Sequence, residues 1–226
     1  TLAGVVTGLL HTKMKIPALL AGILTMIALY SVNLRIMGKA NLSLLGVDTS
    51  FKIARSMLGL NMAQTTLIVG LAVTIIVGSF MYWFFGTQIG AAIRATGFNQ
   101  QMIRAQGVDT DVTIILGLLI SNGLVAVSGA LVAQSNGFSD VGMGTGTIVI
   151  GLASVIIGEV LFGTRSFKNC LISVVLGSIV YRIVIAAVLA MGMPPNDLKL
   201  FTSVLVALAL SMPLIKAKLG SRKVVR

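Results

Sequence analysis

The sequence predicts an all-α polytopic membrane protein, and three observations lead to that fold class. Only 10% of its 226 residues are charged and its mean hydropathy is +1.01, whereas soluble domains are about 25% charged. Several apolar runs are long enough to cross a bilayer core of about 30 Å. The formal net charge of +11 comes largely from basic residues beside these runs, a pattern typical of membrane topology that does not indicate nucleic acid as a partner.

The first half of the chain contains the end of one span and two complete spans. It opens without a Met inside the apolar run TLAGVVTGLL, so we expect an N-terminal truncation with further spans upstream. Residues 16–34 are long enough to cross the bilayer, and 64–85 form the next span, which ends in an aromatic cluster typical of the headgroup boundary. Between them, the mixed segment 35–61 includes FKIARSMLGL, whose pattern predicts a short amphipathic helix.

The second half contains three further spans and one shorter apolar segment. Residues 112–133 form a span with small residues four apart, which let helices approach closely in lipid. A glycine-rich loop, 134–147, precedes the apolar segment 148–162, which is too short for an ordinary crossing. We expect a re-entrant or broken helix there, because irregular backbone at membrane depth survives only within protein or beside a cavity. The last spans are 171–191 and 200–215.

Alternating the loops across the membrane gives the chain an orientation. Eleven lysines and arginines then fall on one side and five on the other, with one inside a span. The positive-inside bias therefore places the polar segment 86–111, the loop 163–169 and the C-terminus in the cytoplasm.

Residues that usually carry chemistry are scarce. Cys170 and His11 are the single cysteine and the single histidine, which excludes an internal disulfide and argues against zinc, haem or a histidine proton relay. The glycines between 137 and 151 lack the phosphate-loop pattern, and no nucleophile–base arrangement is visible. We therefore expect no enzyme activity, no metal and no cofactor in this chain.

Polar residues within the spans are the candidates for a translocation path. Glu159 is the single acidic residue inside an apolar segment and Arg182 the single basic one; such groups are expensive in a bilayer and by default functional. A structural role fits each as well as a gating role, and the two could pair. Most neutral polar groups in spans only link helices by hydrogen bonds. The neutral candidates are Asn61, Gln64, Asn122 and Ser128.

The polar segment 86–111 carries a family pattern. It contains GAAIRATGFNQQMIRAQGVDTD and is followed by IILGLLISNGLVAVSGALVAQ. These residues resemble the cytoplasmic coupling segment and next helix of bacterial ABC-importer permeases of the branched-chain amino-acid and sugar permease superfamily. Phe98 departs from the pattern, because an acidic residue is common there. The fitting positions are Gly90, Arg94, Ala95, Gly97, Asn99, Ala105, Gly107 and Val108.

Three further segments look like the branch of tryptophan/tyrosine-type uptake permeases. They are VNLRIMGKANLSLLG, GLASVIIGEVLFG and IVYRIVIAAVLAMG.

The resemblance implies a single type II-like ABC importer transmembrane domain over residues 1–226. Its coupling segment (86–111) would rest in a cleft of a partner ATPase as two short helices, Ala91–Thr96 and Gln100–Gln106, around a turn at Gly97. The residues implied in ATPase coupling are Arg94, Ala95, Thr96, Gly97, Phe98, Asn99, Gln100, Arg104 and Gly107. The implied partners are a second permease copy, a cytoplasmic ATPase dimer that holds ATP and Mg, an extracytoplasmic solute-binding protein and membrane lipid.

On this resemblance, the chain would be the permease subunit of a bacterial cell-membrane importer. It would move a small organic solute by alternating access driven by the separate ATPase. An amino acid is the expected solute, and aromatic amino acids are the first candidates. The alternative is an ion-coupled secondary transporter that uses Glu159 and Arg182, although the inverted repeat typical of that class is not evident. A channel is the third possibility, favoured only by the short glycine-led segment.

Overall fold

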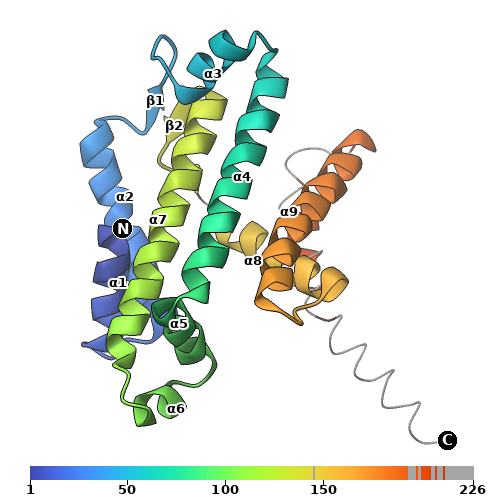
Figure 1. The fold of residues 1–226 in the computed structure, drawn as a ribbon. Helices are drawn as coiled ribbons and strands as arrows, with labels where there is room; N and C mark the ends of the chain where they lie inside the picture. The colour runs from blue at the N-terminus through green and yellow to red at the C-terminus, as the bar shows by residue number, and fades with distance from the viewer. Residues whose placement is uncertain (145, 193–196, 198–199, 205–206, 208–210, 212–226) are drawn as a thin grey trace, which may run out of the picture. The chain divides into compact units, whose positions relative to one another are not determined.

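The computed structural model (Figure 1) describes residues 1–226 except 145, 193–196, 198–199, 205–206, 208–210 and 212–226. The described part is largely helical and divides into two compact units, residues 1–143 and 144–226. In the first unit the elements are α1 (Leu2–Thr12), α2 (Ala18–Met37), β1 (Asn41–Ser43), α3 (Ser50–Leu58), α4 (Met62–Gly86), α5 (Gln88–Phe98), α6 (Gln100–Ala105), α7 (Thr110–Asn136) and β2 (Phe138–Asp140). The described part of the second unit contains α8 (Thr147–Phe162) and α9 (Phe167–Ala190). That the whole chain forms one permease domain stays a prediction.

Four helices in the described part, α2, α4, α7 and α9, are long and apolar enough to cross a membrane. They confirm four predicted spans, with ends shifted by one to four residues. The shifts have a local cause, because capping residues lie beyond the apolar runs. The Asp109 side chain accepts from two backbone amides at the start of α7, and Gly38 ends α2 in the left-handed conformation, with φ of 66°. The predicted span 200–215 falls mostly outside the described residues.

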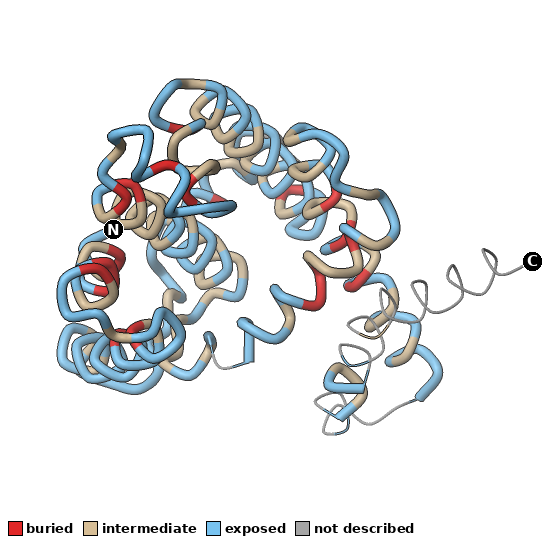
Figure 2. Tube along the Cα trace, turned by 90° about the horizontal axis from the view of Figure 1, so that it is seen from below, coloured by how far each residue is buried: buried red, intermediate tan, exposed pale blue. Residues whose placement is uncertain are grey.

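Two glycines bring α1 against α7. A Cβ on Gly4 would lie 2.9 Å from the Cα of Leu119, and a Cβ on Gly8 would lie 2.8 Å from a side-chain carbon of Ile115. These glycines therefore set a helix separation that larger residues would prevent. Figure 2 marks where the buried residues lie along the chain, and most of those in the described part are small or carry a hydroxyl. The outward side chains of the long helices are apolar and exposed, as expected for helices that face lipid.

A hydroxyl pair joins α2 to this core. Thr7 of α1 donates to the Oγ1 of Thr25 on α2 at 2.8 Å, and both side chains are buried. In lipid such a bond between helices is worth about 0.6 kcal/mol on average, so it adds to the glycine contact without replacing it.

The loops that follow α2 and α7 pair as the short antiparallel strands β1 and β2. Asn41 lies opposite Asp140, and Ser43 opposite Phe138. The sequence predicts only a glycine-rich loop over 134–147, whereas α7 extends to Asn136 and β2 follows it. Strands of three residues are too short for an alternating pattern to reveal them.

The predicted amphipathic helix is confirmed as α3. Its start is fixed by the Thr49 hydroxyl, which accepts from the Lys52 amide at 3.3 Å, and by Gln134 of α7, whose Oε1 accepts from the Ser50 amide at 3.0 Å.

The second unit is built on a close contact between α8 and α9. A Cβ on Gly158 would collide with the Ser173 carbonyl, and one on Gly177 would collide with the Ser154 carbonyl. The α8 helix is continuous over 16 residues. The short apolar segment expected there is thus observed without a break inside the helix, whereas a re-entrant path stays a prediction.

Candidate functional site

The coupling segment (86–111) folds as two helices at one end of the first unit (Figure 1). The turn from α4 into α5 is tight, since a Cβ on Gly90 would collide with the Phe84 carbonyl. The Thr87 hydroxyl caps α5 by accepting from the Gly90 amide at 3.3 Å. Consequently α5 folds directly back on the end of α4.

The turn between the two short helices lies at Asn99, so the predicted turn at Gly97 was wrong. Gly97 belongs to α5 and has no positive φ. Asn99 is extended, with φ of −154°, and its Oδ1 accepts from the Met102 amide at 3.0 Å. Asparagine is among the strongest N-cap residues, and that signal in the sequence points to the observed position.

A buried pair of threonines ties α5 to α7. The hydroxyls of Thr96 and Thr113 lie 2.9 Å apart, and the two residues are 3% and 6% exposed. Each hydroxyl also reaches a backbone carbonyl of its own helix. Because Thr96 is buried in this contact, it is not available to a partner. Its role in coupling would be to position α5 on α7.

Phe98 is the most exposed of the large apolar side chains in the coupling segment, ahead of Ile89 and Met102. Phe98, the last residue of α5, is 91% exposed, and the neighbouring Asn99, Gln100 and Gln101 are exposed as well. Arg94 and Ala95 are half-buried. An exposed aromatic ring within a polar, uncharged rim is available for contact with another molecule.

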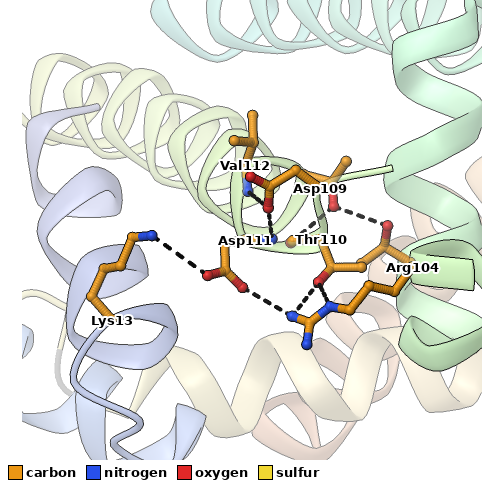
Figure 3. A network of polar contacts seen from close by, with 8 residues as sticks. Lys13, Arg104, Asp109, Thr110, Asp111 and Val112 are labelled. Carbon is orange, nitrogen blue, oxygen red and sulfur yellow. Dashed lines mark hydrogen bonds and ion pairs between the residues drawn. The ribbon is translucent and has the colours of Figure 1, made fainter. Parts of the chain in front are cut away.

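Arg104 joins α6 to the start of α7 (Figure 3). Its Nε and Nη2 donate to the Thr110 hydroxyl at 2.9 and 2.6 Å, and Nη2 lies 3.2 Å from Oδ1 of Asp111. The second carboxylate oxygen of Asp111 is 3.7 Å from Nζ of Lys13, in the loop after α1. Gly107, with φ of 84°, supplies the turn that allows this return.

The ion pair between Lys13 and Asp111 bears on the predicted topology. It places the loop after α1 and the coupling segment at the same end of the first unit. The β1–β2 pairing likewise joins the loops that follow α2 and α7. Both contacts agree with the alternation of loops predicted from the charges; which end faces the cytoplasm stays a prediction.

Within the part of the chain that the structure describes, no hydrogen bond links the four neutral residues predicted for a translocation path into one cluster, and their role in such a path stays a prediction. The backbone amide of Asn61 donates to Oε1 of Gln64 at 3.4 Å, a capping contact at the start of α4. Asn122 donates to the Leu118 carbonyl of its own helix at 2.9 Å, and Ser128 is exposed on α7.

Glu159 and Arg182 are both exposed, on α8 and α9. No ion pair joins them among the described residues, so the pairing considered from the sequence is not observed. The helix register explains this. Gly158 faces Ser173, and Arg182 lies nine residues further along α9, which is about 13 Å at the rise of an α-helix.

Comparison with known proteins identifies the kind of protein to which this segment belongs. A family model described as "Branched-chain amino acid transport system / permease component" matches residues 1–211. The chain belongs to this permease family. The match confirms the resemblance drawn from the coupling segment, and the four long apolar helices of the described part agree with a multi-pass membrane protein.

Two curated relatives resemble the permease over nearly its whole length. A tyrosine transport system permease protein of Clostridioides difficile (strain R20291) is 43% identical over 204 residues, which are 90% of this chain and 66% of the relative. An uncharacterized protein of Rickettsia prowazekii (strain Madrid E) is 33% identical over 212 residues, or 92% of this chain and 73% of the relative. The permease thus spans just under two thirds of the length of the first relative. No solved structure matches it.

Proposed function

We propose that this permease is the membrane subunit of an ATP-binding-cassette importer that carries tyrosine or a related aromatic amino acid into the cytoplasm. The observation that carries the proposal is the coupling segment, a pair of short helices packed on α7 with Phe98 exposed at its tip. The solute follows from the 43% identity to a protein named as a tyrosine transport system permease.

The mechanism requires that a force on the coupling segment reach the spans. α5 joins α4 through the tight Gly90 turn and α7 through the Thr96–Thr113 hydrogen bond. α6 is joined to α7 by the hydrogen bonds from Arg104 to Thr110, and its Ile103 is buried, with 5% exposed. A displacement of the two short helices is therefore delivered to α4 and α7 together, and tilting of these helices would alternate the access of the solute.

The partner that supplies the force is an ATPase, which would hold ATP and Mg and hydrolyse the nucleotide. Phe98 is the contact best suited to a cleft on it, since full burial of such a side chain contributes about 1.5–3 kcal/mol. We place a second permease copy beside the first, because closed two-fold pairs are the commonest assemblies. An extracytoplasmic binding protein would deliver the solute, and the site of action is the bacterial cell membrane with the C-terminus in the cytoplasm.

Uptake into vesicles tests the proposal. The permease, reconstituted with its ATPase and binding protein, should accumulate labelled tyrosine only when ATP is hydrolysed, and a non-hydrolysable ATP analogue should abolish uptake. The second candidate function, ion-coupled transport, is favoured by the exposure of Glu159 and Arg182 on apolar helices. Uptake without the ATPase under a proton or sodium gradient, lost in Glu159→Gln, would support that candidate and overturn the importer.

A further inference from the structure

Asp111 is a junction of three parts of the permease that are distant in sequence. Its Oδ1 contacts Arg104 of α6 and its Oδ2 contacts Lys13 after α1, while Asp111 itself lies in the first turn of α7 (Figure 3). We propose that Asp111 is a positioning residue for coupling, which makes α6, α7 and α1 move as one body. The inference rests on the proposed importer function and assigns a role within it.

The surroundings of Asp111 suit a permanent bridge. Its side chain is 20% exposed, whereas those of Arg104 and Lys13 are 60% and 68% exposed. A carboxylate in the first turn of a helix is favoured by the helix dipole. Arg104 is additionally held by the hydroxyl of Thr110, a residue with no exposed surface. Of the three groups, the central carboxylate is thus the best fixed.

The bridge supplies a connection that packing alone does not. α1 is already locked to α7 by Gly4 and Gly8 near its beginning and middle, while Lys13 lies just beyond its last turn, at the end nearest the coupling segment. Without the Asp111 charge, Arg104 would keep its bond to Thr110, and α6 would lose its link to α1. A push on α6 would then reach α7 but move the end of α1 less.

Asp111→Asn in the complete complex tests the role, and Asp109→Asn is the matched control. The control removes the same charge two residues away. An asparagine at 109 can still accept the hydrogen bonds that the backbone amides of Asp111 and Val112 donate to Asp109. We expect Asp111→Asn to assemble with the ATPase and hydrolyse ATP as the wild type does. The number of tyrosine molecules transported per ATP should fall about fivefold or more in Asp111→Asn, since fivefold is the lower end of usual coupling between two sites. Asp109→Asn should keep the wild-type ratio.

A second measurement does not depend on the transport assay. In a Cys170→Ser background, spin labels on the exposed residues Met14 and Gln101 report the distance between the α1 loop and α6. This distance should stay constant between nucleotide states in the wild type and vary in Asp111→Asn. Lys13→Gln should also make this distance vary between nucleotide states. Because Lys13 is exposed, this second variant keeps the test valid even if Asp111→Asn misfolds.

Two outcomes would overturn the role and are distinguishable. Normal wild-type uptake with equal transport per ATP in Asp111→Asn and Asp109→Asn would overturn the positioning role alone. Absence of ATP-driven uptake in the wild-type complex would overturn the proposed function, and the coupling role with it.

Discussion

Phe98 is an aromatic side chain that the permease leaves 91% exposed in a segment otherwise rich in polar residues. If the ring enters a cleft of the ATPase, Phe98→Ala removes about 1.5–3 kcal/mol of apolar burial, which corresponds to an affinity roughly 10-fold to 100-fold lower. Titration of the ATPase against the permease in nanodiscs measures this change. Met14→Ala, at a 66% exposed residue outside the coupling segment, is the control. An affinity unchanged by Phe98→Ala would remove Phe98 from the interface.

The Thr96–Thr113 pair makes a prediction about stability rather than binding. Thr96→Val keeps the shape and removes the hydroxyl bond between α5 and α7, so it should lower the free energy of unfolding by about 0.5–1.5 kcal/mol. Thermal unfolding in detergent measures it. Thr74→Val, whose exposed hydroxyl bonds only to its own helix, should have a smaller effect. The double change Thr96→Val with Thr113→Val should cost less than the sum of the two single changes, because the bond that the two hydroxyls share is lost only once.

At the scale of elements, the corrected turn position reverses an expectation about the coupling helices. Asn99→Ala removes the N-cap of α6 and should cost about 1 kcal/mol of its stability. Gly97→Ala should be tolerated and favour α5, because a Cβ there meets no atom within 4 Å and alanine has the higher helix propensity. Hydrogen exchange of the α6 amides, with ATPase co-purification, compares the two variants. Faster exchange or weaker co-purification in Gly97→Ala than in Asn99→Ala would mean that the turn lies at Gly97.

The α8–α9 contact offers a pair of glycines on one helix for comparison. Gly158→Ala would push a methyl group into the Ser173 carbonyl, whereas Gly151→Ala meets nothing within 4 Å. We expect the first change to destabilise the permease by about 1–3 kcal/mol through overpacking, and the second to be neutral or stabilising. Unfolding in detergent and the yield of folded protein measure both. Equal behaviour of the two variants would mean that α8 and α9 are not this close in the membrane.

At the scale of the whole molecule, the sequence predicted those features that the bilayer itself selects. α2, α4, α7 and α9 were found because a membrane requires long apolar helices, and that requirement is visible in composition. The residue pattern identifies the coupling segment but misplaces its turn, because the glycine at 97 suggests a turn whereas the capping side chain of Asn99 sets the observed one.

The contacts that hold the site together were not predictable in the same way. Arg104, Thr110 and Asp111 are seven residues apart at most, but they meet only because Gly107 turns the chain back. Lys13 joins them from nearly a hundred residues earlier, through the packing of α1 on α7. Such contacts depend on tertiary geometry, which no local period in the sequence encodes.

The orientation of the permease is the last prediction, and it tests the charge argument directly. The excess of basic residues places the coupling segment in the cytoplasm, so the loop between α2 and α3 faces outward. In a Cys170→Ser background, Leu45→Cys, at an 87% exposed residue of that loop, should react with a membrane-impermeant maleimide on intact cells, while Gln101→Cys should not. Inverted vesicles should reverse the two results. The opposite labelling would place α5 and α6 outside the cell, beyond the reach of any cytoplasmic ATPase, and would exclude the coupling role.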